Sequence, residues 1–415
     1  MSFSPAGQGR GVRENRLFVG GNALVRLEGF SSATGPPGVR AGYSAELESV
    51  RAIAALFVFA RHIAGRMVGP GAEEGPPGFF YSFAVGGQTG VTLFFVLSAF
   101  LLVPPFLEKR PISTRRFLAR RFLRLWPLYF GAVLVATAWN AEGLGDFAKG
   151  FGYLVYAQSF SGFVTPLEPF SSVWWSLATE VQFYAALVVC AFLGARRFGP
   201  QVLGVLLVLY AVAYSIFVMT GFGVENFATS VALRVSLFGR GWSFLLGGLA
   251  AGLYVRHGAA WRRALAQLPW LARGGGDGLV LLVLGGMGLL LMKVETIGTW
   301  RAEIEWLPWH IPESALWAAF ILGVLVLPLR SRSLLVSFPL ERLGIISYSF
   351  YLWHLPVIVG VASLLGIDPS HPGTTPANVL VPAVSLAFAV SWAVSELTYR
   401  WIERPLLLRK QHLAR

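Results

Sequence analysis

Arg51 and His62 are the residues of this chain whose types and spacing most clearly suggest chemistry. They lie eleven positions apart in the apolar segment RAIAALFVFARH. At ~3.6 residues per helical turn, eleven residues make about three turns, so both side chains share one helix face about 16 Å apart along the axis. Arginine binds anions, and histidine accepts or donates a proton near neutral pH. Inside a membrane, such ionisable residues indicate a functional site.

Glu180 is the predicted partner of His62. It belongs to the segment WWSLATEVQFY, in which Ser176, Glu180 and Tyr184 recur every fourth residue and form one polar stripe. We expect His62 and Glu180 to lie at the same depth, roughly 10–12 Å below the outer membrane surface, and to meet if their helices touch. A carboxylate beside an imidazole orients the ring and stabilises its protonated form. The two residues are therefore the predicted catalytic pair.

A basic segment before the third apolar stretch contains a second arginine cluster. The sequence RRFLARRFLRLWP places Arg121 and Arg124 at i, i+3 on one side of an amphipathic helix at the inner membrane surface. Paired guanidinium groups bind phosphates through bidentate, charged hydrogen bonds. The same residues also suit a stop-transfer cluster that contacts anionic lipid, and the segment alone does not separate these two roles.

A second polar stripe lies near the end of the chain, in ISYSFYLWH. Ser347, Tyr351 and His354 follow i, i+4, i+7, so they share a helix face that reaches the middle of the membrane. The alternative for His354 is a histidine that hydrogen-bonds a neighbouring helix. The remaining histidines fall in predicted loops without metal-ligand spacing, and no metal site is expected. They are His257, His310, His371 and His412.

Three further polar residues lie in or beside apolar segments. Arg61 precedes His62, Ser98 ends the apolar segment GVTLFFVLS, and Arg240 lies about six residues from the outer end of its segment. Arg240 either contacts a substrate or extends its charge toward the membrane surface. The candidate substrate-binding residues are Arg61, Ser98, Arg240, Tyr351 and His354.

The elements that position these residues are predicted to be membrane helices. Hydrophobic residues make up 55% of the 415 positions and charged residues 13%, which excludes an ordinary soluble enzyme. Windows of ~20 apolar residues predict an all-α, polytopic membrane protein with about ten spans. These lie near 48–69, 86–106, 125–140, 172–193, 201–221, 234–255, 278–293, 314–329, 343–366 and 378–399.

The net charge is +13, and the positions of the Lys and Arg residues indicate how the chain is oriented in the membrane. With a cytoplasmic N-terminus, 26 of the 34 Lys and Arg residues fall in cytoplasmic segments and three in external loops. This bias predicts that both termini are cytoplasmic and argues against nucleic-acid binding. Residues 1–44 are predicted to be a flexible basic tail, 45–405 the transmembrane domain and 406–415 a second tail. The single cysteine, Cys190, excludes a disulfide within the chain.

These motifs, in this order, resemble the acyltransferase family 3 of integral membrane O-acyltransferases. The resemblance runs from about Ala45 to Pro405. It rests on the arginine and histidine of the first span, the GVTLFFVLS segment, the paired basic-loop arginines, and the motifs WSLATEVQFY, ISYSFYLWH and ERP. The chain departs from the family pattern at three positions, where Ala99, Glu48 and Arg61 replace the usual glycine, aspartate and uncharged residue. Some relatives carry an added extracytoplasmic domain, which we do not expect here.

The resemblance implies essential roles for Arg51, His62, Arg121 and Arg124. Together with the residue chemistry, it suggests transfer of an acyl group, with acetyl expected, from cytoplasmic acyl-CoA to a hydroxyl of a carbohydrate or glycosylated small molecule. The arginines would bind CoA phosphates, and His62 would act as general base or form an acyl-histidine. Acyl-CoA is then a co-substrate rather than a bound cofactor, membrane lipid is the surrounding partner, and the bacterial cytoplasmic membrane is the expected location.

Two other functions remain open from the residues. Ten spans with buried Arg, His and Glu also suit a proton-coupled transporter or exporter. A non-catalytic membrane scaffold is disfavoured, because buried ionisable groups cost several kcal/mol without an evident purpose. Modification of the acceptor that depends on CoA separates an enzyme from a transporter.

Overall fold

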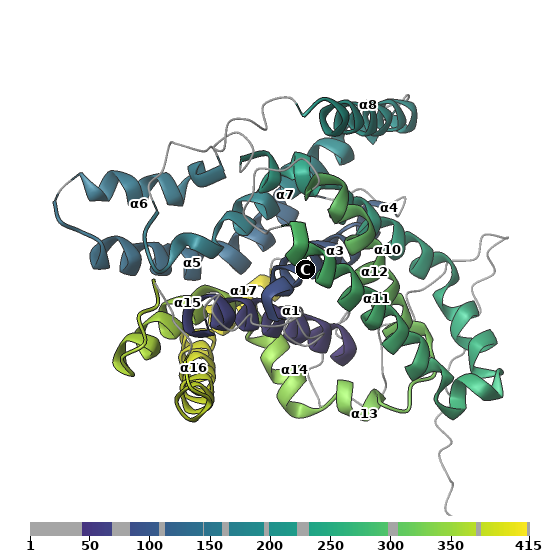
Figure 1. Cartoon of the computed structure of the whole chain (residues 1–415). Helices are drawn as coiled ribbons and strands as arrows, with labels where there is room; N and C mark the ends of the chain where they lie inside the picture. Colours follow the sequence, from purple (N-terminus) through teal and green to yellow (C-terminus); the bar gives the residue numbers. More distant parts are fainter. Residues whose placement is uncertain are drawn as a thin grey trace, which may run out of the picture.

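The chain folds as a bundle of α-helices (Figure 1). The computed structural model describes residues 44–68, 84–107, 113–143, 145–159, 166–194, 199–221, 232–297, 306–370 and 375–412. Residues 1–43 of the predicted tail, and His371, lie outside the described residues. No strand occurs in the described stretches, which confirms the all-α prediction. The helices are α1 (Ala45–Ile63), α3 (Thr89–Leu102), α4 (Pro104–Leu107), α5 (Thr114–Trp139), α6 (Asp146–Leu154), α7 (Trp175–Gly194), α8 (Gly199–Thr220), α10 (Leu237–Ala266), α11 (Gly276–Ile297), α12 (Trp306–Val326), α13 (Arg332–Leu335), α14 (Phe338–Ile345), α15 (Ser347–Leu364), α16 (Ala377–Thr398) and α17 (Arg404–His412).

Within the residues that the structure describes, eight helical segments are long and apolar enough to cross a membrane. They correspond to eight of the ten predicted spans, and the chain is a multi-pass membrane protein. The other two predicted spans, 48–69 and 234–255, fold mainly as α1 and α10 but are not among these eight segments. The reason is composition, because α1 contains four charged residues within 19 positions, and in α10 Arg240 and several glycines lower the mean hydropathy of the apolar part. Eight of the ten predicted spans are therefore candidate membrane helices in the described residues, in agreement with the prediction of a polytopic all-α membrane protein.

The helix that carries Arg51 and His62 lies in the interior of the bundle. Figure 1 shows α1 and α3 near the middle, with α5 and α6 to one side and α10, α11 and α12 to the other. Contacts of α1 with α3, α14 and α15 cover much of its length. At Gly90 and Gly344, an added Cβ would collide with backbone carbonyls of Ala54 and Glu48. Glycine at these two positions allows α3 and α14 to approach α1 closely.

The outer helices present apolar side chains away from the bundle. α8 is the clearest case, because its exposed residues include Val205, Leu207, Val208 and Leu209, while few of its residues are buried. Such a surface is unfavourable in water but suits the hydrocarbon interior of a bilayer. The polar residues of interest thus lie inside a shell of lipid-facing helices.

Candidate active site

Two of the three predicted phosphate-binding arginines are paired with carboxylates of the chain. Arg51 Nη1 donates to Glu48 Oε1 at 2.6 Å, one helical turn earlier in α1. Arg124 Nη1 donates to Glu403 Oε2 at 3.3 Å, and Ser349 also donates to Glu403. These ion pairs fix both guanidinium groups near the beginning of α1 and α15, and they reduce the positive charge available to a ligand.

Arg121 differs from the other two arginines in its hydrogen bonding. It lies one turn before Arg124 in α5, with its guanidinium carbon 5.9 Å from the centroid of the Phe117 ring. Its Nε atom is buried, and within the described stretches it has no hydrogen-bond partner. Because a buried donor without a partner is costly, this N–H is available to an incoming acceptor.

Glu180 lies on α7 and connects Tyr184 of the same helix with Ser98 of α3. It accepts hydrogen bonds from Ser98 Oγ at 3.0 Å and from Tyr184 Oη at 2.5 Å. The Tyr184 hydroxyl also interacts electrostatically with Arg121. Arg121, Tyr184, Glu180 and Ser98 therefore form a continuous polar connection through the bundle. The hydrogen bond between Tyr184 and Glu180 confirms their part of the predicted stripe, whereas its third member, Ser176, contacts Tyr351 instead.

His62 is next to another histidine rather than to Glu180. The ring centroids of His62 and His354 are 5.1 Å apart, with an angle of 52° between the ring planes. In the described part of the chain, no hydrogen bond or ion pair joins His62 to Glu180. The orienting role of Glu180 therefore stays a prediction. Arg61 adds positive charge beside His62, since the two side chains interact electrostatically.

Tyr351 links the histidine pair to α7. Its ring centroid is 5.9 Å from that of His354, and its hydroxyl donates to the Val173 carbonyl at 2.6 Å. The same hydroxyl lies 2.7 Å from Ser176 Oγ. The predicted stripe of Tyr351 and His354 on α15 thus faces the interior. It brings α1, α7 and α15 together at the end of α1 that carries His62.

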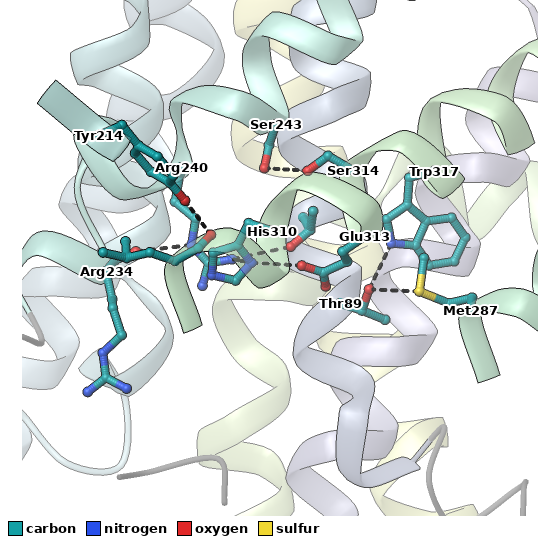
Figure 2. Close-up of polar contacts among 12 residues, drawn as sticks. Thr89, Tyr214, Arg234, Arg240, Ser243, Met287, His310, Glu313, Ser314 and Trp317 are labelled. Atoms are coloured by element: carbon teal, nitrogen blue, oxygen red, sulfur yellow. Dashed lines mark hydrogen bonds and ion pairs between the residues drawn. The ribbon is translucent and has the colours of Figure 1, made fainter. Parts of the chain in front are cut away.

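Arg240 belongs to a buried charged cluster that the sequence analysis did not foresee (Figure 2). Its Nη1 atom lies 3.0 Å from His310 Nδ1 and 3.3 Å from Thr92 Oγ1, and its Nε donates to the Arg234 carbonyl at 3.1 Å. Glu313 Oε2 lies 2.8 Å from the same His310 nitrogen. Arg240, His310 and Glu313 are 9%, 2% and 2% exposed.

The two contacts of His310 Nδ1 are alternatives. When this nitrogen carries a proton it donates to Glu313, and when it does not it accepts from Arg240. Arg240 also lies over the Trp175 ring, at 5.2 Å, which is a cation–π distance. It therefore faces the interior of the bundle and does not extend toward the membrane surface.

The prediction that His257, His310 and His412 lie in loops is wrong, and His412 is the last residue of α17. His257 is in α10 and His310 is in the first turns of α12, which begins eight residues before the predicted span at 314. Pro308, Pro312 and Glu313 reduce the hydropathy of this segment and hid the helix start. The spacing of His310 and Glu313, at i and i+3, was the signal that could have paired them on one helix face.

Comparison with known proteins places the bundle in a family. The sequence matches the acyltransferase domain of acyltransferase family 3 over residues 44–396. The chain belongs to this family. No solved structure is significantly similar to it.

Three relatives have names that describe acyl transfer or polysaccharide production. A protein named as the membrane-bound transacylase BcsY of Komagataeibacter xylinus is 27% identical over 79% of this chain and 78% of its own length. The peptidoglycan O-acetyltransferase OatA of Listeria monocytogenes is 26% identical over 88% of this chain and 56% of its own length. The exopolysaccharide production protein ExoZ of Rhizobium meliloti is 27% identical over 78% of this chain and 90% of its own length.

The chain thus spans about half the length of the O-acetyltransferases that it matches and most of the other two relatives. Membership in the acyltransferase family, together with the membrane helices, identifies the chain as a membrane O-acyltransferase.

Proposed function

We propose that this acyltransferase transfers an acyl group, with acetyl expected, from cytoplasmic acyl-CoA to a hydroxyl of a carbohydrate or glycosylated acceptor. The relatives that act on peptidoglycan or take part in exopolysaccharide production support a cell-envelope carbohydrate as acceptor. The bacterial cytoplasmic membrane is the proposed location, with both termini in the cytoplasm. The observation that carries the proposal is the buried, unpartnered Nε of Arg121, which lies at one end of a polar connection through the bundle.

The proposed reaction uses His62 as general base. The imidazole takes the proton of the acceptor hydroxyl while the hydroxyl oxygen forms a bond to the thioester carbonyl carbon. The carbon–sulfur bond then breaks, and the proton passes to sulfur, so that CoA leaves as a thiol. An acyl-histidine at His62 is the alternative route to the same products. The distance from Arg51 to His62 along α1, about 16 Å, would be spanned by the pantetheine arm.

The arginines have different proposed roles. Arg121 would donate its free Nε–H directly to a CoA phosphate. Arg51 and Arg124, held by Glu48 and Glu403, would offer their remaining guanidinium N–H groups to the same phosphates. Glu180 remains the proposed orienting carboxylate for His62, and Ser98, Tyr351, His354, Arg61 and Arg240 remain candidate substrate contacts.

Labelled acetyl transfer tests the function. Membranes containing the protein are incubated with acetyl-CoA labelled in the acetyl group. The acceptor is cell-envelope polysaccharide prepared from cells that lack the protein. We expect the label to appear in the polysaccharide as base-labile ester, with release of one CoA thiol per ester. The buried Arg240, His310 and Glu313 would also suit proton-coupled transport. Movement of the acceptor across vesicles without ester formation would support a transporter and contradict acyl transfer.

Arg121→Ala is expected to raise the KM for acetyl-CoA about 10-fold to 100-fold, because one charged hydrogen bond to phosphate is lost. The kcat should change much less, since Arg121 contacts the donor and not the reacting carbonyl. The measurement is initial transfer rate against acetyl-CoA concentration. Arg115→Ala is the matched control, because Arg115 lies on the same helix with its side chain exposed. Equal KM values for the two variants would contradict the role of Arg121.

A further inference from the structure

Contacts with two backbone carbonyl oxygens determine the tautomer of His354. Its Nδ1 atom lies 2.8 Å from the Tyr351 carbonyl oxygen and 3.1 Å from the Phe350 carbonyl oxygen. A carbonyl oxygen only accepts hydrogen bonds, so Nδ1 carries the proton and donates it. In the neutral ring, Nε2 therefore holds the lone pair and is ready to accept a proton.

The Nε2 atom of His354 is buried and unused by the fold. His354 is 1% exposed, and within the described residues its Nε2 has no hydrogen-bond partner. The Phe350 ring is nearly parallel to the imidazole, with an angle of 6° and a centroid distance of 6.1 Å, and helps to fix its plane. Natural proteins rarely leave a buried acceptor unpaired, and a catalytic role is one of the explanations for such a group.

His62 lies closer to the His354 ring than the other titratable ring in contact with it, Tyr351, whose centroid is 5.9 Å away. The two histidine ring centroids are 5.1 Å apart, and they belong to helices that pack directly against each other. The groups that act electrostatically on His62 are His354, Arg61 and Arg66, each of which is positive when charged. Positive neighbours oppose the simultaneous protonation of two adjacent histidines. The pair is therefore suited to pass one proton between its members.

We propose that His354 is the proton-relay partner of His62, a proposal that rests on the function proposed above. When the acceptor binds, the two rings, whose centroids lie 5.1 Å apart, rotate into hydrogen-bond contact. As one nitrogen of His62 takes the acceptor proton, its other nitrogen gives its own proton to Nε2 of His354. The acceptor oxygen bonds to the acyl carbon, and the carbon–sulfur bond breaks. The proton on His354 then returns to His62, which delivers its other proton to the thiolate sulfur. The acceptor proton is thus balanced by the proton that leaves on CoA, and both rings end neutral.

His354→Gln tests the relay, because glutamine can accept a hydrogen bond but cannot take a proton at neutral pH. In the labelled transfer assay we expect kcat to fall about 10²-fold, near the lower end of general acid–base effects, while the KM for acetyl-CoA stays within about twofold of the wild-type value. A kcat within about twofold of wild type, in a preparation where His62→Ala is inactive, would overturn the relay but leave the function standing.

His354→Gly separates proton transfer from packing. Its cavity can admit imidazole from the buffer, and we expect added imidazole to restore a measurable part of the lost rate in this variant but not in His62→Gln. A loss of rate that imidazole does not restore would overturn the relay, because it would indicate a packing role. If His62→Ala instead keeps full transfer activity, the proposed catalytic function of this site fails first, and the two failures are therefore distinguishable.

Discussion

Replacement of His62 by alanine is expected to lower the kcat of acetyl transfer by about 10²–10⁴-fold, the usual contribution of a positioned general base. The effect should appear in kcat, because the donor phosphates are expected to bind about 16 Å away at the other end of α1. The KM for acetyl-CoA should therefore change little. The measurement is the initial rate of labelled acetyl transfer in membranes with equal amounts of folded protein.

His257→Ala is the control for removing a histidine from the bundle. His257 is partly buried in α10 and stacks on Trp261 at a centroid distance of 5.6 Å, away from the contacts of His62. It should keep wild-type kcat. If His62→Ala transferred acetyl at the rate of His257→Ala, His62 would not be the base, and the mechanism on α1 would be contradicted.

The sequence predicted the features that depend on local spacing. Apolar windows located eight spans, and the i, i+4 spacing of Glu180 and Tyr184 predicted a stripe that the structure shows as a hydrogen bond. The ordered motifs also predicted the family, because several short patterns in one order are far more specific than any one of them.

The sequence did not predict which side chains meet across the bundle. His62 and Glu180 were expected to pair because both were predicted at a similar depth below the outer membrane surface. Depth alone does not determine which helices pack against each other. The structure instead places His354 beside His62 and Ser98 beside Glu180. His354 is 292 positions from His62 in the sequence, and Ser98 is 82 positions from Glu180. Only helix packing brings the members of each pair together. The same reason hid the contact of Arg124 with Glu403.

The second large effect is expected at Glu313, whose removal leaves a cation buried. Arg240 and Glu313 are almost fully buried and attract each other electrostatically. The Nδ1 atom of His310 lies within hydrogen-bond distance of both side chains. Removing one member of a buried ion pair typically costs about 3–5 kcal/mol, because the remaining charge stays desolvated without compensation. We expect Glu313→Ala to lower the free energy of unfolding by this amount, and to reduce the midpoint of thermal unfolding in detergent micelles.

A double variant distinguishes the lost charge balance from lost packing. Arg240→Met combined with Glu313→Leu replaces both charges by apolar groups of similar size, and should recover most of the stability lost in Glu313→Ala. Glu142→Ala is the control, because its side chain is exposed and its contact with Asp146 uses the backbone N–H. An unfolding midpoint for Glu313→Ala equal to that of Glu142→Ala would contradict the stabilising role of Glu313. The double variant could also be as stable as wild type and still transfer acetyl more slowly. In that case stability does not explain why the cluster is charged, and Arg240 is best understood as a substrate contact.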